Sequence, residues 1–185
     1  MPPEKISGQA FEENERLIIV SSRDKLLEEG DLLPRIVGAR FDSDEKASQF
    51  YDVNAIQGIK ILSIVNMHDT EICDLQTARM EAFAKSHPDV TVISVSKQEP
   101  EDLGRVAETQ SVSHMLLSID DETAEILGVQ LEPEESASPE WRLMLLRGII
   151  VADSNNRIVH FQRVYNQMDE PDYEAAFNTV EKITI

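Results

Sequence analysis

The chain of 185 residues contains one cysteine, Cys73. A single cysteine cannot form a disulfide within the chain, a Cys-x-x-Cys redox pair or a zinc site built from several thiolates. What remains is one free thiol, and free thiols are often buried as small apolar side chains. The residues around Cys73 must therefore decide whether this thiol packs in the core or reacts.

Basic residues and long apolar runs are also scarce. Lys and Arg number 17 against 35 Asp and Glu, and the resulting net charge of −18 repels nucleic-acid phosphates and anionic membranes. The longest apolar runs, such as residues 143–152, are too short to span a bilayer, and the first fifteen residues have no apolar signal core. We therefore expect a cytoplasmic protein that binds neither nucleic acid nor a membrane.

The remaining composition is ordinary for a soluble globular protein. Hydrophobic residues make up 41% and charged residues 28%, with 7 Gly and 8 Pro. A chain of this length forms one domain with a substantial core. We expect residues 1–12 to be disordered and residues 13–185 to form that single domain.

Apolar runs alternate with helical patterns from Ile59 onward. A buried strand at residues 59–65 leads into a helix that Asp69 or Thr70 can cap and that ends before His87-Pro88. Further strands are predicted at residues 90–95, 115–117, 145–152 and 158–164, and further helices at residues 100–108, 123–127 and 171–183. This order predicts an α/β fold with a central mixed sheet flanked by helices on both faces.

The other segments give weaker signals. Residues 17–21 and 35–41 can form strands, which would give the sheet an N-terminal β extension. The segment EPEESASPE at residues 132–140 has the composition of a surface loop, and residues 153–156 form the turn of a hairpin between the last two strands.

Five segments resemble one protein family. HDTEICDLQT at residues 68–77 resembles the D-T-x-x-C-x-x-Q-T signature around the peroxidatic cysteine of bacterial thiol peroxidases. In the same order, Gly30-Asp31 with Pro34, ISVS at 93–96, LRGIIVAD at 146–153 and EPDYEAA at 170–176 resemble further parts of that family. The resemblance covers residues 30–183 and implies a thioredoxin-like (peroxiredoxin) fold with thiol peroxidase activity.

Three residues carry the predicted chemistry. A thiolate attacks the O–O bond of a peroxide, so the site must favour the ionised form of Cys73. The first helical turn offers unpaired N–H groups, and Arg147, in the strand that resembles the family's arginine strand, adds a fixed positive charge. The resemblance implies that the Thr70 hydroxyl lies beside the sulfur and binds peroxide. The alternatives are a simple N-cap at Thr70 and a structural ion pair at Arg147.

The neighbours of Cys73 allow other interpretations. Asp69, Glu71 and Asp74 oppose thiolate formation, because like charge disfavours an ionised sulfur. His68 could be the base of a cysteine hydrolase, but no supporting acid or oxyanion motif accompanies it. The spacing of these residues fits no standard metal site, and we expect neither a metal nor another cofactor.

At three positions the chain departs from the family pattern. Asn66 stands where the family has a proline that shields the thiolate, and Asp121 stands where the family often has an arginine. Ala107 occupies the position of the resolving cysteine. A Cys73 sulfenic acid would therefore be reduced by an external thiol, by another protein's cysteine or by a second copy of the chain.

Two functions remain open from the sequence. The first is a one-cysteine thiol peroxidase that reduces hydrogen peroxide or small organic hydroperoxides, with a thioredoxin-like protein or a small thiol as reductant. The second is a catalytically weak or inactive peroxiredoxin-like module for binding or redox sensing, for which Asn66, Ala107 and Asp121 are the argument. The resemblance also implies a homodimer.

Overall fold

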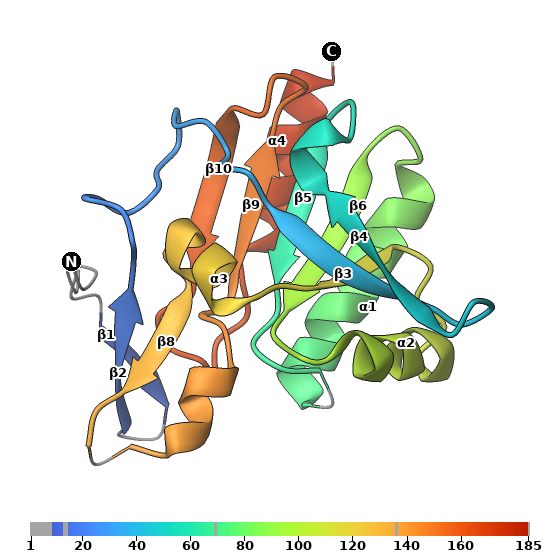
Figure 1. Ribbon diagram of the computed structural model, residues 1–185. Helices are drawn as coiled ribbons and strands as arrows, with labels where there is room; N and C mark the ends of the chain where they lie inside the picture. Colours follow the sequence, from blue (N-terminus) through green and yellow to red (C-terminus); the bar gives the residue numbers. More distant parts are fainter. Residues whose placement is uncertain (1–8, 13–14, 69, 136, 185) are drawn as a thin grey trace.

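Two β-sheets organise the computed structural model, which describes residues 9–12, 15–68, 70–135 and 137–184 (Figure 1). The strands are, in chain order, β1 (Gln9–Glu12), β2 (Glu15–Val20), β3 (Val37–Asp42), β4 (Ala47–Asp52), β5 (Lys60–Ile64), β6 (Thr91–Ser96), β7 (Met115–Ser118), β8 (Gln130–Pro133), β9 (Gly148–Ala152) and β10 (Ile158–Arg163). The helices are α1 (Glu71–Ser86), α2 (Pro100–Thr109), α3 (Asp121–Leu127) and α4 (Tyr173–Ile183), with 3-10 helices η1 (Val53–Ala55) and η2 (Pro139–Leu143).

The larger sheet has seven strands in the order β10-β9-β5-β6-β7-β3-β4. β5, β6 and β7 are parallel, whereas β9 pairs antiparallel with β5, and β3 pairs antiparallel with β7. The sheet is therefore mixed, as predicted, and the carboxyl ends of its parallel strands lie at one edge. β1 and β2 join β8 in a separate three-stranded sheet, so that of the two strands predicted for the N-terminal β extension one (β2) lies in this sheet and the other (β3) in the larger one.

Helices cover both faces of the larger sheet (Figure 1). On one face, α1 and α4 contribute Met80, Phe83 and Val180 to a cluster of buried side chains, and α2 covers β7 through Leu103 and Val106. On the other face, α3 and the smaller sheet enclose the most extensive cluster of buried apolar residues. Burial of apolar surface on both faces explains why the central strands read as continuous apolar runs.

Most predicted elements are confirmed within a few residues, but one predicted loop is wrong and one strand was not predicted. Residues 132–140, predicted to be a loop, begin with the end of β8 and end within η2, because the buried Leu131 and Trp141 anchor the segment at both ends. The alternation of polar and apolar residues does not predict β4, whose side chains are half-buried or exposed at the edge of the sheet.

The strand predicted at residues 145–152 begins at Gly148. Leu145 instead forms an isolated bridge with Gln130, and the Leu146 N–H donates to the Val129 carbonyl over 2.8 Å. These bonds hold the chain beside β8 before it enters the larger sheet. Arg147 therefore lies where the chain crosses from the smaller sheet to the larger one.

The N-terminal segment expected to be disordered, residues 1–12, is only partly described. Its last four residues form β1, which pairs antiparallel with β2 from Gln9↔Ile18 to Glu12↔Glu15. Residues 1–8 lie outside the described part of the chain. Pairing with β2 gives the backbone of β1 hydrogen-bond partners, which its composition alone does not predict.

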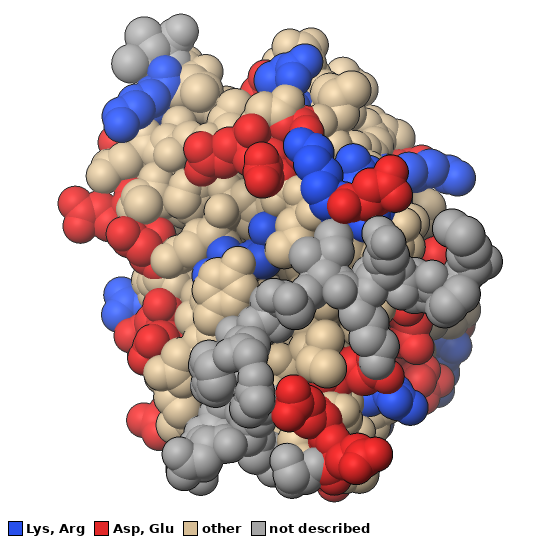
Figure 2. All heavy atoms as spheres, turned by 90° about the vertical axis from the view of Figure 1, so that its left-hand side faces the viewer, with Lys and Arg blue, Asp and Glu red and all other residues tan. Residues whose placement is uncertain are grey.

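Acidic side chains form several separate groups on the face that carries the smaller sheet, with Lys and Arg side chains between them (Figure 2). The net charge of −18 gives the molecule a negative field that acts mainly on charged partners. Within the described ranges, no helix combines the length and the apolar character needed to cross a membrane.

A buried polar network fixes α1 to the beginning of β7. The Glu81 carboxylate accepts hydrogen bonds from the backbone N–H groups of Ser113 and His114 at 2.9 and 3.1 Å, and from the Ser113 hydroxyl at 2.5 Å. It also lies 2.7 Å from His114 Nδ1, while His114 Nε2 lies 2.9 Å from the Ser94 hydroxyl. The network therefore joins α1, β6 and β7.

The two titratable groups of this network differ in charge. Burial alone would raise the pKa of Glu81, but the hydrogen bonds from Ser113 and His114 outweigh it and hold that pKa well below the ordinary value. Burial lowers the pKa of His114, although the Glu81 carboxylate opposes this. At neutral pH the imidazole is therefore neutral, so that Nδ1 donates to Glu81 and Nε2 accepts from Ser94.

The Glu81→Gln variant should be less stable than the wild type at pH 7 by about 2–4 kcal/mol, because several buried donors lose a carboxylate acceptor. A group with a lowered folded-state pKa stabilises above its unfolded value, here 4.5, and loses that contribution as the pH falls. The stability difference should therefore shrink below about pH 4.5. Urea unfolding at pH 7 and pH 4 measures it, with Glu101→Gln on the exposed side of α2 as control. An equal difference at both pH values would contradict this assignment.

Candidate active site

Cys73 lies in the first turn of α1, directly after the loop that follows β5. The helix begins after Thr70, whose extended backbone (φ −119°, ψ 147°) makes it the N-cap, and Asp69, the other predicted cap, lies outside the described residues. The Cys73 side chain is only 1% exposed. The predicted helix start is confirmed, and it places the thiol near the N–H groups and the positive end of the helix dipole.

The structure brings Arg147 to this thiol. Nη1 of Arg147 lies 3.5 Å from Cys73 Sγ, although the two residues are separated by 74 positions, and Arg147 is only 3% exposed. The position next to Arg147 must be small, because a Cβ on Gly148 would lie 2.5 Å from the Gln162 carbonyl oxygen of β10. This close strand pairing fixes the backbone from which the guanidinium extends.

Neutral oxygen atoms surround the rest of the guanidinium. Nη1 also donates to Gln76 Oε1 at 3.3 Å, and Nη2 donates to the Gln167 carbonyl at 3.2 Å. Nε is buried and has no hydrogen-bond partner within the described part of the chain. None of the ion pairs between described residues involves Arg147, so the alternative of a structural ion pair finds no carboxylate among them.

Gln76 connects this cation to the central sheet. Its Nε2 donates to the Ser63 hydroxyl at 2.8 Å and to the Ile64 carbonyl at 3.2 Å, so its Oε1 is turned toward Arg147. Gln76 is fully buried. The sequence signature contains this residue, but its spacing from Cys73 predicts no role for it, because its hydrogen-bond partners lie at least 12 positions away in the chain.

Thr70 lies at the entrance of the site. Its side chain makes no cap hydrogen bond, and its hydroxyl instead donates to the Met67 carbonyl at 3.2 Å. A different threonine, Thr77, binds the backbone of Cys73. Its hydroxyl donates to the Cys73 carbonyl at 2.9 Å and lies 3.3 Å from His68 Nδ1. The role of Thr70 as a peroxide-binding hydroxyl stays a prediction.

A cavity of about 260 Å³ lies beside Arg147. The first turn of α1 and the segment around Gln167 form two of its walls, and η2 and the residue after it supply apolar side chains. It is lined by Asn66, Thr70, Glu71, Ile72, Trp141, Met144, Arg147, Gln167 and Met168. Cys73 is not among these residues, whereas Arg147, whose Nη1 lies 3.5 Å from the sulfur, is one of them. The polar composition of residues 132–140 did not predict that this segment leads into a wall of the site.

The three positions that depart from the family pattern lie in different places. Asn66 lines the cavity and donates from Nδ2 to Gln167 Oε1 at 3.1 Å. Asp121 begins α3 and pairs with Lys97 Nζ at 2.6 Å. Asn66 is therefore the one of these three replacements that lines the cavity beside Arg147.

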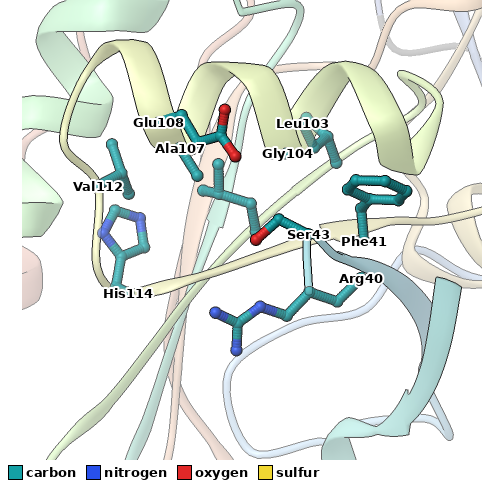
Figure 3. A pocket seen from close by; sticks show the side chains of 10 residues that line it. Arg40, Phe41, Ser43, Leu103, Gly104, Ala107, Glu108, Val112 and His114 are labelled. Carbon is teal, nitrogen blue, oxygen red and sulfur yellow. The ribbon is translucent and has the colours of Figure 1, made fainter. Parts of the chain in front are cut away.

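Ala107 belongs to another cavity, of about 190 Å³, between α2 and the β3–β7 side of the sheet (Figure 3). Its methyl group lies near Val112 and Leu103, with the His114 ring at one end and Arg40 below. The position that carries the resolving cysteine in the family is thus occupied here by a side chain with no redox chemistry.

No group of three or more His, Cys, Asp or Glu side chains in the described ranges could hold a metal ion. Asp69, which belongs to the acidic cluster around Cys73, lies outside those ranges. The site that the structure describes is built from one thiol, one guanidinium and neutral amides and hydroxyls. Such a set favours attack by an ionised sulfur, with the guanidinium as an electrostatic partner.

Comparisons with known proteins agree with this arrangement. No protein-family model matches the chain. A thiol peroxidase of Streptococcus sanguinis is 30% identical over 127 residues, which is 67% of this chain and 73% of the relative. A thiol peroxidase of Corynebacterium glutamicum is 31% identical over 123 residues, 65% of this chain and 72% of the relative.

Solved structures show the same fold. A peroxiredoxin-like protein from Aquifex aeolicus superposes with a TM-score of 0.78 at 19% identity, covering 95% of this chain and 96% of its own. A thiol peroxidase from Chromobacterium violaceum gives a TM-score of 0.75 at 19% identity, covering 96% and 98%. The predicted thioredoxin-like peroxiredoxin fold is confirmed.

The Gln76→Met variant should lose about 1–3 kcal/mol of unfolding free energy, because the Ser63 hydroxyl, the Ile64 carbonyl and Arg147 Nη1 each lose a buried partner. Urea unfolding measures the loss, and Gln57→Met serves as control, because Gln57 is exposed and donates one hydrogen bond to the Ala55 carbonyl. Equal stability of Gln76→Met and the wild type would show that Gln76 does not hold this site together.

Proposed function

The chain belongs to the thiol peroxidase family, and from this we propose that it is a one-cysteine peroxidase that reduces hydrogen peroxide or small organic hydroperoxides through Cys73. The observation that carries the proposal is the 3.5 Å contact between Arg147 Nη1 and Cys73 Sγ in a buried setting. Burying a cation among neutral partners lowers the stability of the folded protein by roughly several kcal/mol, unless a negative charge lies beside the cation. The thiolate of Cys73 is the group in contact that can supply this charge.

The proposed reaction begins with ionisation of Cys73, whose proton passes to solvent. The thiolate sulfur then attacks the terminal oxygen of ROOH, so that an S–O bond forms while the O–O bond breaks. Sulfur is oxidised to sulfenic acid, and the leaving RO⁻ takes a proton to become ROH, or water when R is hydrogen. Arg147 stabilises the thiolate before attack and the charge on the leaving oxygen during it. Its buried Nε, which has no partner among the described residues, is a further available donor.

Thr70 completes the proposed site from the cavity side. Its hydroxyl now donates to the Met67 carbonyl, and a threonine hydroxyl can accept a hydrogen bond at the same time. The peroxide O–H can therefore donate to Thr70 while its oxygens accept from Arg147. Both residues line the cavity, which supports this pairing.

The sulfenic acid needs two external reducing equivalents. A first thiol forms a mixed disulfide with Cys73 and releases water, and a second thiol then releases Cys73 as a thiol. Ala107 cannot take part, so the reductant is a small thiol, a thioredoxin-like protein or a second copy of the chain. This dependence fits a reducing, cytoplasmic compartment. The family resemblance adds a homodimer to the proposal.

The cavity and the surface charge support small neutral substrates. Trp141, Met144 and Met168 give the cavity an apolar side against which an alkyl group can pack. The net charge of −18 disfavours the approach of anionic hydroperoxides, while it leaves neutral ones unaffected.

A second candidate function is a redox-sensing or binding module with little turnover. The observation that favours it is the burial of Cys73, which is 1% exposed and is not among the residues that line the cavity. A slow reaction with peroxide and a long-lived sulfenic acid would distinguish a sensor from a peroxidase.

Replacement of Cys73 by Ser should abolish reaction with peroxide, and Arg147→Lys should slow it by about 100-fold, because lysine cannot offer the same fork of donors. Stopped-flow measurement of peroxide consumption gives the rate, and a sulfenic-acid trap with mass spectrometry locates the oxidised residue. The exposed Arg105→Lys on α2 is the matched control. A wild-type rate no faster than that of a free thiol in solution would rule out the peroxidase.

A further inference from the structure

Asn66 forms a buried pair with Gln167, a residue to which the sequence analysis assigned no role. The Asn66 Nδ2 donates to Gln167 Oε1 at 3.1 Å across 101 positions of the chain. Asn66 is 7% exposed and Gln167 is 3% exposed, and both line the cavity beside Arg147. Two amides in such a place need partners, because an unpaired buried amide is destabilising.

Both the side chain and the backbone of Gln167 accept hydrogen bonds from Arg147. Its Oε1 accepts from the Arg147 backbone N–H at 3.3 Å, and its carbonyl accepts from Nη2 at 3.2 Å. Its Nε2 donates to the Val164 carbonyl at 2.6 Å, and the Val164 N–H donates to the Arg147 carbonyl at 2.8 Å. The three residues thus form a closed ring of hydrogen bonds around the backbone that carries the guanidinium.

The ring explains why an asparagine suits position 66. A side-chain amide oxygen accepts two hydrogen bonds, and Gln167 Oε1 receives one from Arg147 and one from Asn66. A proline at this position would have no side-chain donor, and Oε1 would keep one partner. The replacement at position 66 therefore matches the presence of Gln167.

We propose that Gln167 is a positioning residue that holds the Arg147 guanidinium against Cys73, and that Asn66 locks Gln167 in this orientation. The pair acts on the thiolate through Arg147, and its effect on turnover rests on the proposed function. Displacement of a catalytic group by a fraction of an ångström lowers the reaction rate, so a support of this kind affects chemistry as well as stability.

The test uses the full chain with Gln167→Met, Asn66→Ala and the double variant. Methionine has nearly the length of glutamine but makes none of the three side-chain hydrogen bonds, while its backbone carbonyl still accepts from Arg147 Nη2. Gln49→Met is the control, because Gln49 makes side-chain hydrogen bonds on β4 at the opposite edge of the sheet. Two readouts are measured: the rate constant with hydrogen peroxide, and the rate of Cys73 alkylation by iodoacetamide as a function of pH, which reports the thiolate fraction.

We expect Gln167→Met to lower the peroxide rate constant by about 10- to 100-fold and to move the alkylation profile to higher pH. Asn66→Ala should have a smaller effect in the same direction. The double variant should be no worse than Gln167→Met, because Asn66 acts through Gln167. Gln49→Met should match the wild type in both readouts.

Wild-type values for Gln167→Met in both readouts would overturn the proposal, and additive losses in the double variant would overturn the coupling of the two amides. If Gln167→Met does not fold, Asn66→Ala decides, and an unchanged alkylation profile in that variant would count against the proposal. A wild-type protein that reacts no faster than a free thiol would refute the peroxidase function alone. The alkylation profiles would still decide whether Gln167 positions Arg147.

Discussion

The buried guanidinium of Arg147 is the constraint on which the rest of the site depends. It sits in an apolar interior, 3% exposed, with amide oxygens and a thiol as its described partners. Removing such a charge from water costs far more than one hydrogen bond returns, so several groups have to share the stabilisation. The residues of the site therefore stabilise one buried cation. The thiol of Cys73 can ionise and so become the counter-ion of this cation.

The fold brings hydrogen-bonding residues to Arg147 from two separate elements. From α1, Gln76 reaches Arg147 while its amide nitrogen is held by Ser63 and Ile64 of β5. From the segment after β10, Gln167 reaches both the backbone and the guanidinium. Arg147 itself lies where the chain passes from the smaller sheet to the larger one. Two amides on independent elements thus limit the movement of a long side chain that could otherwise adopt many rotamers.

The sequence predicted the parts of this site that depend on local pattern. Helix capping rules place Cys73 in a first turn, and an arginine inside an apolar run has to be buried and partnered. Composition failed where tertiary contacts decide the structure, as with Trp141, which is anchored in the core although a polar segment precedes it. The roles of Gln76 and Gln167 depend on contacts across some 70 and 20 positions, which no periodicity records.

The burial of Cys73 separates the two halves of the proposed cycle. A small peroxide can enter a cavity of about 260 Å³, whereas the cysteine of another protein must bring its own backbone close to the sulfur. Because Cys73 is only 1% exposed, the residues around it would have to move before a protein thiol could reach the sulfur. A small thiol needs less opening. Under the proposed function, the cavity therefore admits a small peroxide, and the burial of Cys73 restricts which thiol can reduce it.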